Sequence, residues 1–287
     1  MSKQKLCVSF SGGRTSAYMT KRILELYSDT YEIHVLFANT GQEHEKTLDF
    51  INNCDKHWGF GTVWLEAKVH YGERKASTHQ VVDYQTCNRI GKPYHDVCKK
   101  YGLPSHAYLH CTRELKENPI KSYRKEHGIN DCMFALGMRV DEMRRVKPVD
   151  KRGEIVYPLV DWFPTTKPEI LEWFQKQPFD LEIPDYLGNC KWCFKKTFSK
   201  LIKIVKEHPD YFDFPRELED DFEMIGSEKF EGNPRKLFRG FRNTDDIFKM
   251  ALDKEQYELD FKEIIIDDAK ASDCAESCEP FADGVTK

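Results

Sequence analysis

The sequence lacks the features that mark membrane proteins, secreted proteins and dedicated nucleic-acid-binding proteins. No apolar run approaches the roughly 20 residues of a membrane-spanning helix, and the N-terminus has no signal-peptide profile. No repeat or arginine-rich tract argues for a nucleic-acid partner. We therefore expect a cytoplasmic protein with no membrane partner.

Apolar residues and cysteine, in contrast, are plentiful. The 287 residues are 40% hydrophobic, which is enough for one large domain with an appendage. Ten cysteines in a large chain without an export signal indicate reduced, metal-binding or redox-active thiols rather than disulfides. Residues 254–287 carry ten acidic and four basic residues, against a net charge of −4 for the whole chain. The body is thus mildly basic, which suits anionic small molecules.

Residues 5–20 give the first functional signal. Leu6, Val8 and Phe10 are spaced as in a short strand, and apolar residues recur at helical spacing after residue 16. A strand, a glycine-containing loop and a helix in this order present backbone N–H groups to an anion. An ordinary tight turn would explain the glycines alone about as well. The expected anion-binding residues of this loop are Ser9, Ser11, Gly12, Gly13, Arg14, Thr15 and Ser16.

Predicted strands and helices alternate beyond this loop. Residues 32–38, 62–66 and 132–138 are strand candidates, with helical patterns between them. Such alternation predicts an α/β fold, a parallel twisted sheet with helices on both faces. Ligands of these sheets bind at the carboxyl ends of the strands. The turn at residues 39–43 follows such an end, so we expect Thr40, Gly41 and Glu43 beside the ligand, with a solvated polar loop as the alternative.

A Cys-x-x-Cys pair, Cys190 and Cys193, is the second functional signal. Both sulfurs of such a pair converge from one turn, as two ligands of one metal or a dithiol require. Two sulfurs cannot complete a tetrahedral site, so further ligands must come from elsewhere. The candidates are Cys111, Cys87 and Cys98, with His110 and His95 as poorer ones. Thiolate ligands favour an iron–sulfur cluster first and zinc second, ahead of a catalytic dithiol.

The first loop also carries a family resemblance. Ser-Phe-Ser-Gly-Gly-Arg-Thr-Ser at residues 9–16 resembles the pyrophosphate loop, Ser-Gly-Gly-x-Asp-Ser, of the adenine nucleotide alpha-hydrolase superfamily. Thr15 stands where that loop has its aspartate, which often acts around the phosphate or its metal. An ATP-splitting reaction that depends on Mg²⁺ is therefore a weaker expectation than nucleotide binding itself.

Later segments resemble the PAPS (3′-phosphoadenosine 5′-phosphosulfate) reductase-like family, in particular its compact phage and bacterial members. Arg139, Glu142 and Arg145 match the family's Gly-x-Arg-x-x-Glu-x-x-Arg stretch, which implies that they are catalytic residues. Residues 157–162 resemble its Pro-Leu-x-Asp-Trp segment. The matches follow the family's order along the first two thirds of the chain. We predict a nucleotide-binding α/β domain at 1–198, a helical C-terminal extension at 199–265 and an acidic, disordered tail at 266–287.

The resemblance implies an adenine nucleotide substrate (ATP, APS or PAPS; APS is adenosine 5′-phosphosulfate) and reduction of its sulfate group. Plant-type APS reductases bind a 4Fe–4S cluster through an upstream cysteine pair and a later Cys-x-x-Cys. The implied metal ligands here are Cys87, Cys111, Cys190 and Cys193, although the upstream pair is not intact. Either Cys87 completes the cluster, or three cysteines leave one iron open, as in some cluster-dependent thiolases. Mg²⁺ is a further candidate cofactor, a thioredoxin-like or other thiol reductant a candidate partner, and a homodimer a candidate assembly.

One family segment is missing. PAPS reductases carry their attacking cysteine in a C-terminal Glu-Cys-Gly-Leu-His segment, which this chain lacks; Cys274 and Cys278 of the tail are the expected substitutes, with inert exposed thiols as the alternative. The missing segment favours a rival, an ATP-dependent thiolase acting on tRNA or DNA bases, whereas Thr15 argues against it. A third hypothesis is a non-catalytic, zinc-stapled nucleotide-binding module that regulates a partner.

Overall fold

The computed structural model describes residues 3–151, 153–270 and 279–281, within which six strands form one sheet in the order β4-β3-β2-β1-β5-β6. The strands are β1 (Gln4–Ser9), β2 (Tyr31–Asn39), β3 (Val63–Lys68), β4 (Thr78–Val82), β5 (Met133–Ala135) and β6 (Ile155–Val156). β4 pairs antiparallel with β3, and the other neighbouring strands pair in parallel. The predicted α/β fold with a largely parallel sheet is confirmed.

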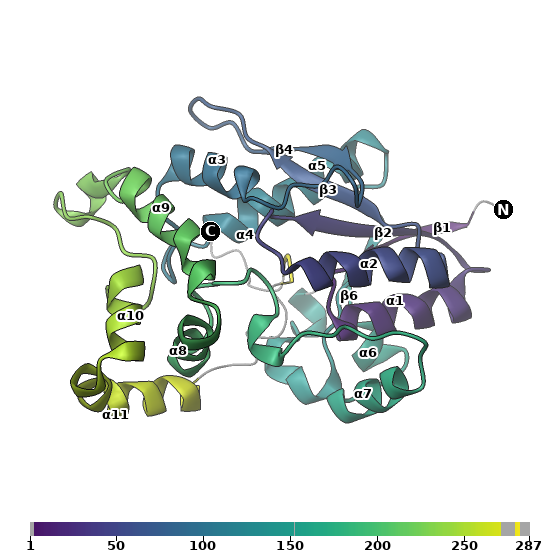
Figure 1. Ribbon diagram of the computed structural model, residues 1–287. Helices are drawn as coiled ribbons and strands as arrows, with labels where there is room; N and C mark the ends of the chain where they lie inside the picture. The colour runs from purple at the N-terminus through teal and green to yellow at the C-terminus, as the bar shows by residue number, and fades with distance from the viewer. Residues whose placement is uncertain (1–2, 152, 271–278, 282–287) are drawn as a thin grey trace.

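Helices cover both faces of this sheet (Figure 1). On one side lie α1 (Arg14–Tyr27), α2 (Glu45–Trp58), α6 (Pro158–Asp161) and α7 (Lys167–Gln175). On the other lie α3 (Lys92–Tyr101), α4 (His110–Thr112), the π-helical turn η1 (Arg113–Glu117) and α5 (Asn118–Glu126). Short 3₁₀ turns occur at Val140–Arg145, Val149–Lys151, Asp185–Leu187, Pro209–Phe212 and Ser227–Phe230.

The core follows the alternation that the sequence shows in β1. Leu6 and Val8 join a hydrophobic cluster with residues of α1, α2 and α7, whereas Cys7 joins a second cluster with residues of α5. Edge strand β4 was not expected, because its side chains are half-buried or exposed and its residues show little apolar periodicity. β6 is only two residues long, which is too short for periodicity to reveal.

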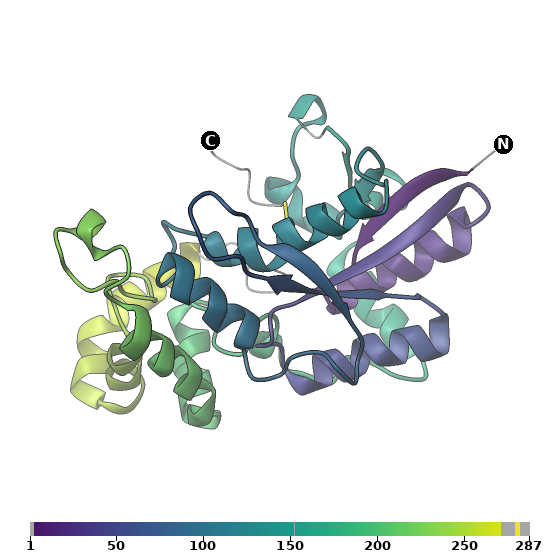
Figure 2. The same ribbon diagram turned by 90° about the horizontal axis from the view of Figure 1, so that it is seen from above.

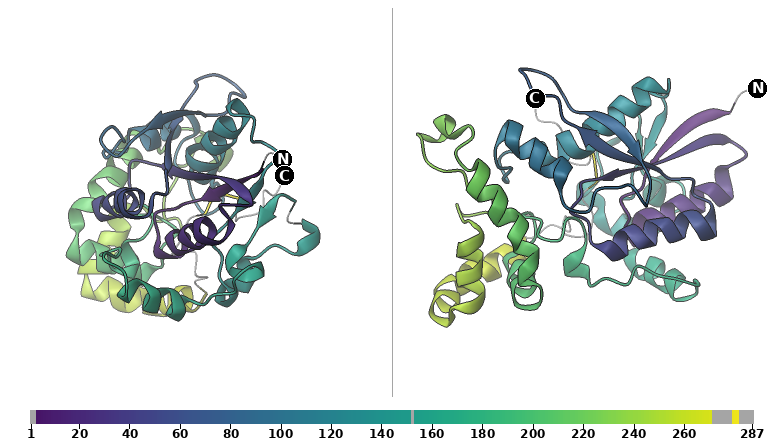
Figure 3. Two further views of the ribbon diagram at one scale, coloured as in Figure 1. Left: turned by 90° about the vertical axis from the view of Figure 1, so that its right-hand side faces the viewer. Right: turned by 45° about the horizontal axis from the view of Figure 1, so that its top comes forward.

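The C-terminal extension is helical, as predicted. It comprises α8 (Phe198–Glu207), α9 (Asp213–Phe222), α10 (Thr244–Leu252) and α11 (Lys254–Lys270), which form a group at the end of the molecule away from the N-terminus (Figures 2 and 3). Leu201 and Ile247 belong to the same hydrophobic cluster as Leu6, so the extension shares the core of the sheet domain. No helix in the described part of the chain is long and apolar enough to span a membrane.

The end of the chain returns to the middle of the molecule. α11 continues to Lys270, beyond residue 266, where we expected the disordered tail to begin. Residues 279–281 lie apart from α11 and contact β1, η1 and β5; Figure 1 shows them as a short yellow segment near the start of α2.

Candidate functional site

The loop between β1 and α1 opens the N-terminus of α1 to a cavity. Gly13 precedes the helix, and no side chain among the described residues caps it by a hydrogen bond. Ser16 Oγ holds the loop closed, because it donates to Gly13 O at 3.0 Å and accepts from Ser11 N–H at 3.2 Å. Ser11 to Ser16 all line the cavity. Helix N-termini of this kind bind anions through their backbone N–H groups and the helix dipole.

Gly12 makes this tight loop possible. Its φ is +80°, in the left-handed region that favours glycine. A Cβ at this position would lie 2.8 Å from both Thr47 Cγ2 and Ile51 Cδ1 of α2. Any side chain here would therefore push the loop away from α2.

Arg139 connects the loop to the 3₁₀ turn at Val140–Arg145. Its Nη1 donates to Thr15 Oγ1 at 3.0 Å and lies 3.2 Å from Glu142 Oε2, and its Nε donates to Asp141 Oδ1 at 3.0 Å. Arg145 Nη1 donates to Glu142 Oε1 at 2.6 Å. The side chains of Arg139 and Glu142 are 4% and 1% exposed. The structure thus brings the three predicted catalytic residues into one buried ionic network beside the loop.

The far wall of the loop cavity is apolar. Arg14 points to this wall, where its Nε and Nη2 donate to the two carboxylate oxygens of Asp180 at 2.6 and 2.9 Å. That bidentate pair fixes the segment carrying Leu181. Ile170, Leu171, Leu181 and Ile183 form the wall, and Arg139 and Lys167 add cations. Backbone N–H groups and cations on one side and apolar side chains on the other suit a nucleotide.

The turn after β2 contacts the Cys-x-x-Cys segment. Thr40 Oγ1 donates to Glu43 Oε1 at 2.8 Å and lies 3.5 Å from Cys190 Sγ. Glu43 forms a β-bridge with Cys190. Gly41 has a φ of +80°, and a Cβ there would lie 2.6 Å from Asn88 Oδ1. Glu43 therefore closes its own turn, and Thr40 faces the cysteines.

Cys111, Cys190 and Cys193 line a second cavity, together with Thr40, Tyr94, Leu115, Lys116 and Phe194. Burial raises the pKa of Cys190 well above its usual range, and the charges of Glu43 and Cys193 raise it further. A bound metal would offset this, because a cation favours the thiolate. Three sulfurs with apolar walls fit an iron–sulfur cluster, and they do not all lie within 4.8 Å of one another, as the ligands of a single ion would. Asn189 lines both this cavity and the loop cavity, so the two cavities share a wall at this residue.

The remaining candidate ligands lie elsewhere or outside the described residues. Cys87 Sγ lies 3.5 Å from Tyr84 O and accepts from Arg89 Nη1 at 3.2 Å, apart from the cysteine cavity. Cys98 is fully buried beside Cys111. Burial is the main cause of the raised pKa of Cys98, and the charge of Cys111 raises it further. His110 Nε2 lies 3.0 Å from Gly102 O. Cys274 and Cys278, the expected attacking thiols, lie outside the described residues.

Lys116, Lys167 and Glu279 are site residues that we did not predict. The π-helical turn Arg113–Glu117 buries Lys116, although a charge run normally marks a solvated face. π-Helical turns are rare and often occur at functional sites. The charge of Lys116 lowers the pKa of both Cys190 and Glu279, against the larger effect of burial, so it acts on both parts of the site. No sequence pattern marked these three residues.

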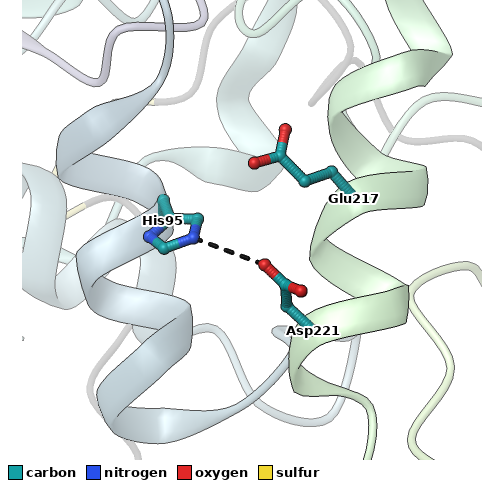
Figure 4. Close-up of side chains that lie close together, drawn as sticks. All are labelled: His95, Glu217 and Asp221. Atoms are coloured by element: carbon teal, nitrogen blue, oxygen red, sulfur yellow. Dashed lines mark ion pairs between the residues drawn. The ribbon is translucent and has the colours of Figure 1, made fainter.

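A second group of possible metal ligands lies on the surface (Figure 4). His95 of α3 faces Glu217 and Asp221 of α9, with one ligand atom of each within 4.8 Å of the others. His95 Nε2 is 3.6 Å from Asp221 Oδ2, and both carboxylates are exposed. His95 and Asp221 form an ion pair that links the helical extension to α3, and we assign no ligand to the three residues.

Comparison with known proteins gives related sequences. Residues 5–176 match the family described as the phosphoadenosine phosphosulfate reductase domain. An uncharacterized nin region protein, ORF290, of Escherichia phage lambda is 34% identical over 285 residues, covering 96% of this chain and 94% of that protein. An uncharacterized protein of Methanocaldococcus jannaschii is 26% identical over 137 residues, covering 48% of this chain and 23% of that protein.

A solved structure was also found. The phosphoadenylyl-sulfate (PAPS) reductase from Candida auris, in a phosphate complex, aligns with a TM-score of 0.38 and 17% identity over 60% of this chain and 71% of that chain. Membership rests on the family match, which covers more than half of the chain, and on the end-to-end similarity to the phage protein. The chain belongs to the phosphoadenosine phosphosulfate reductase domain family.

Proposed function

We propose that the protein is an adenine-nucleotide-binding enzyme of sulfur chemistry that reduces APS- or PAPS-type substrates. The observation that carries this proposal is the shared wall between the loop cavity and the cysteine cavity at Asn189. A phosphosulfate bound at the loop would lie next to buried sulfur ligands. Membership in the PAPS reductase domain family supports both nucleotide binding and sulfur chemistry.

Each side of the loop cavity has a role in this proposal. The N–H groups of the Ser11–Ser16 loop bind the phosphate oxygens, and Arg139 neutralises their charge. Ile170 and Leu181 offer an apolar surface to the adenine ring. Thr15, at the position of the family's aspartate, accepts a hydrogen bond from Arg139. A neutral threonine in place of a carboxylate removes an oxygen ligand for Mg²⁺, and so favours the reductase over the thiolase with its Mg²⁺-dependent ATP cleavage.

The proposed step is attack by a cysteine thiolate on the sulfate sulfur of APS or PAPS. A sulfur–sulfur bond forms while the bond from that sulfur to the bridging phosphate oxygen breaks, and the nucleoside phosphate leaves as an anion. Loop N–H groups and Arg139 stabilise this leaving group. A thiolate of an external dithiol then attacks the cysteine sulfur, forms a mixed disulfide and releases sulfite. The thiols are oxidised, the sulfate sulfur is reduced, and a thioredoxin-like dithiol restores the enzyme.

Cys278 is our candidate for the attacking thiol, with Cys274 as the second candidate. Support comes from the sequence, because both cysteines lie in the C-terminal tail, where the family carries its attacking cysteine. Cys111, Cys190 and Cys193 would hold an iron–sulfur cluster, or zinc as the alternative. The bound group would keep these thiols deprotonated beside the phosphosulfate.

Release of sulfite tests this proposal. Protein purified without oxygen is incubated with APS or PAPS and a dithiol, and sulfite is measured. We expect turnover by the wild type and its loss in Cys278→Ser, with Cys87→Ser as the matched control. Absence of sulfite from both substrates, together with ATP-dependent transfer of sulfur to tRNA or DNA, would replace the reductase by the thiolase. Nucleotide binding without turnover in a zinc protein would leave the non-catalytic module.

A further inference from the structure

The carboxylate of Glu279 lies buried against the nucleotide loop. The residue is 3% exposed, and Ser9 Oγ donates to its Oε2 at 2.8 Å across 270 residues of sequence. The hydroxyl of Ser11 and the charges of Lys116 and Arg145 lower the pKa of Glu279, against the larger effect of burial. These are the hydroxyl and cationic groups with which the loop would meet an incoming anion.

Phe281 anchors the carboxylate in this position. Its backbone N–H donates to Glu117 Oε1 at 3.1 Å, and its carbonyl accepts from Lys147 Nζ at 2.9 Å. Its ring packs edge-on against Phe134 of β5, with ring centroids 5.1 Å apart. Lys121 lies over the same ring, 5.1 Å from its centroid. Contacts from η1, α5, β5 and the segment after the 3₁₀ turn therefore specify where this tripeptide docks.

A carboxylate oxygen and a phosphate or sulfate oxygen accept hydrogen bonds from the same donors. The hydroxyl proton of Ser9 cannot serve Glu279 and a ligand oxygen at once. Two anions side by side in a buried site would also repel each other strongly. We propose that Glu279 is an internal occupant of the loop's anion site, and that a phosphate or sulfate group binds there only when residues 279–281 undock. For nucleotides this inference rests on the proposed function.

The arrangement makes nucleotide affinity depend on the C-terminal segment. A tethered competitor acts at an effective concentration in the millimolar range or above. Removing its charge should therefore tighten anion binding by about tenfold or more. Loosening the Phe281 anchor should act in the same direction while leaving the carboxylate in place.

Calorimetric titration of the full chain with inorganic pyrophosphate, and separately with ATP, tests this inference. We expect Glu279→Gln and Phe281→Ala each to bind pyrophosphate about tenfold more tightly than the wild type. Glu258→Gln, an exposed carboxylate of α11, is the charge-matched control and should bind like the wild type. Circular dichroism of each variant verifies its fold, and Phe281→Ala keeps the test valid if Glu279→Gln folds poorly.

Hydrogen exchange gives a second readout on the segment itself. Pyrophosphate should speed exchange of the Phe281 amide, whose hydrogen bond to Glu117 exists only in the docked state. Equal affinities for wild type and Glu279→Gln, with unchanged exchange at Phe281, would overturn the inference and leave the proposed function intact. Tighter pyrophosphate binding by the variants without any ATP binding would support the inference and overturn the proposed function. Absence of pyrophosphate binding in every variant would overturn both.

Discussion

Arg139 is the side chain on which the loop, the 3₁₀ turn and the cavity converge. It contacts Thr15, Asp141 and Glu142 at the same time, which only a planar guanidinium with five donors can do. Glu142 in turn binds Arg145. The motif Gly-x-Arg-x-x-Glu-x-x-Arg therefore specifies an internal network as well as charges near a ligand, and loss of one member removes a partner from the buried charges that remain.

We expect Arg139→Lys to lower the free energy of unfolding by about 2 kcal/mol, because a lysine keeps the charge but cannot make these contacts together. Nucleotide affinity should fall about tenfold. Arg144→Lys, at the exposed neighbouring position, should change neither property. Urea denaturation and calorimetric titration measure the two effects. Wild-type stability and affinity in Arg139→Lys would contradict the role assigned to this network.

At the scale of elements, the β1–loop–α1 unit was predictable because its signals are local. The strand alternation, the glycines and the helical spacing all fall within residues 5–20. The need for glycine at position 12, however, comes from α2, since Thr47 and Ile51 occupy the space of a Cβ. Sequence reasoning marked the residue, and its left-handed φ together with the packed helix explains it.

Gly12→Ala should destabilise the protein by about 2–4 kcal/mol, as the sum of left-handed backbone strain and close contacts with α2. Gly59, at the end of α2, has a φ of +66°, and a Cβ there would meet no described atom within 4 Å. Gly59→Ala should therefore cost only about 1–2 kcal/mol. The free energies of unfolding of both variants, from thermal or urea denaturation, separate the cost of left-handed backbone strain from the cost of contact with α2. Equal losses would mean that contact with α2 does not contribute.

The Cys-x-x-Cys segment and α4, which carries Cys111, form the metal-binding element that we propose. Protein purified without oxygen should contain iron and acid-labile sulfide, or zinc under the alternative. The metal should be lost in Cys190→Ser and Cys111→Ser. Cys87→Ser should keep the metal, because Cys87 lies with Tyr84 and Arg89 away from the cavity. Elemental analysis of the three variants shows which cysteines bind the metal. Metal retained in Cys190→Ser, or lost in Cys87→Ser, would contradict this assignment.

At the scale of the whole molecule, the helical extension supports the cysteine segment. Arg239 Nη2 donates to the carbonyls of Lys195 and Lys196, at 2.9 and 3.2 Å. Glu219 of α9 accepts from Thr244 N–H at the start of α10. Burial raises the pKa of Glu219 to about 7, although the hydrogen bonds from Thr244 oppose this effect. The extension is thus held to the cysteine segment by hydrogen bonds, and its contribution to stability depends on pH.

Stability of the wild type should fall as the pH rises through about 7. The folded protein binds the Glu219 proton more tightly than the unfolded chain, so this contribution is complete below the unfolded pKa of about 4.3 and is lost as the pH passes the folded pKa. Relative to Glu219→Gln, the wild type should lose about 2–4 kcal/mol between pH 5 and pH 8. Asp220→Asn, at an exposed position, is the control. Parallel pH profiles for wild type and Glu219→Gln would contradict this prediction.

Long-range contacts limited what the sequence could predict. The α/β sheet, the loop and the Cys-x-x-Cys segment follow from local patterns, and the family motifs added Arg139 and its partners. Lys116 and Glu279 could not be found in this way. Lys116 is buried by a π-helical turn that leaves no sequence signature, and Glu279 contacts Ser9 across 270 residues within a segment that composition marks as disordered.

Mass spectrometry of the protein after incubation with APS or PAPS, without reductant, tests the central claim most directly. The proposed step stops at the covalent intermediate under these conditions. We predict one added SO₃ group on a cysteine of the peptide that contains Cys278, released as sulfite when dithiol is added. An unmodified protein with both nucleotides intact would contradict the account.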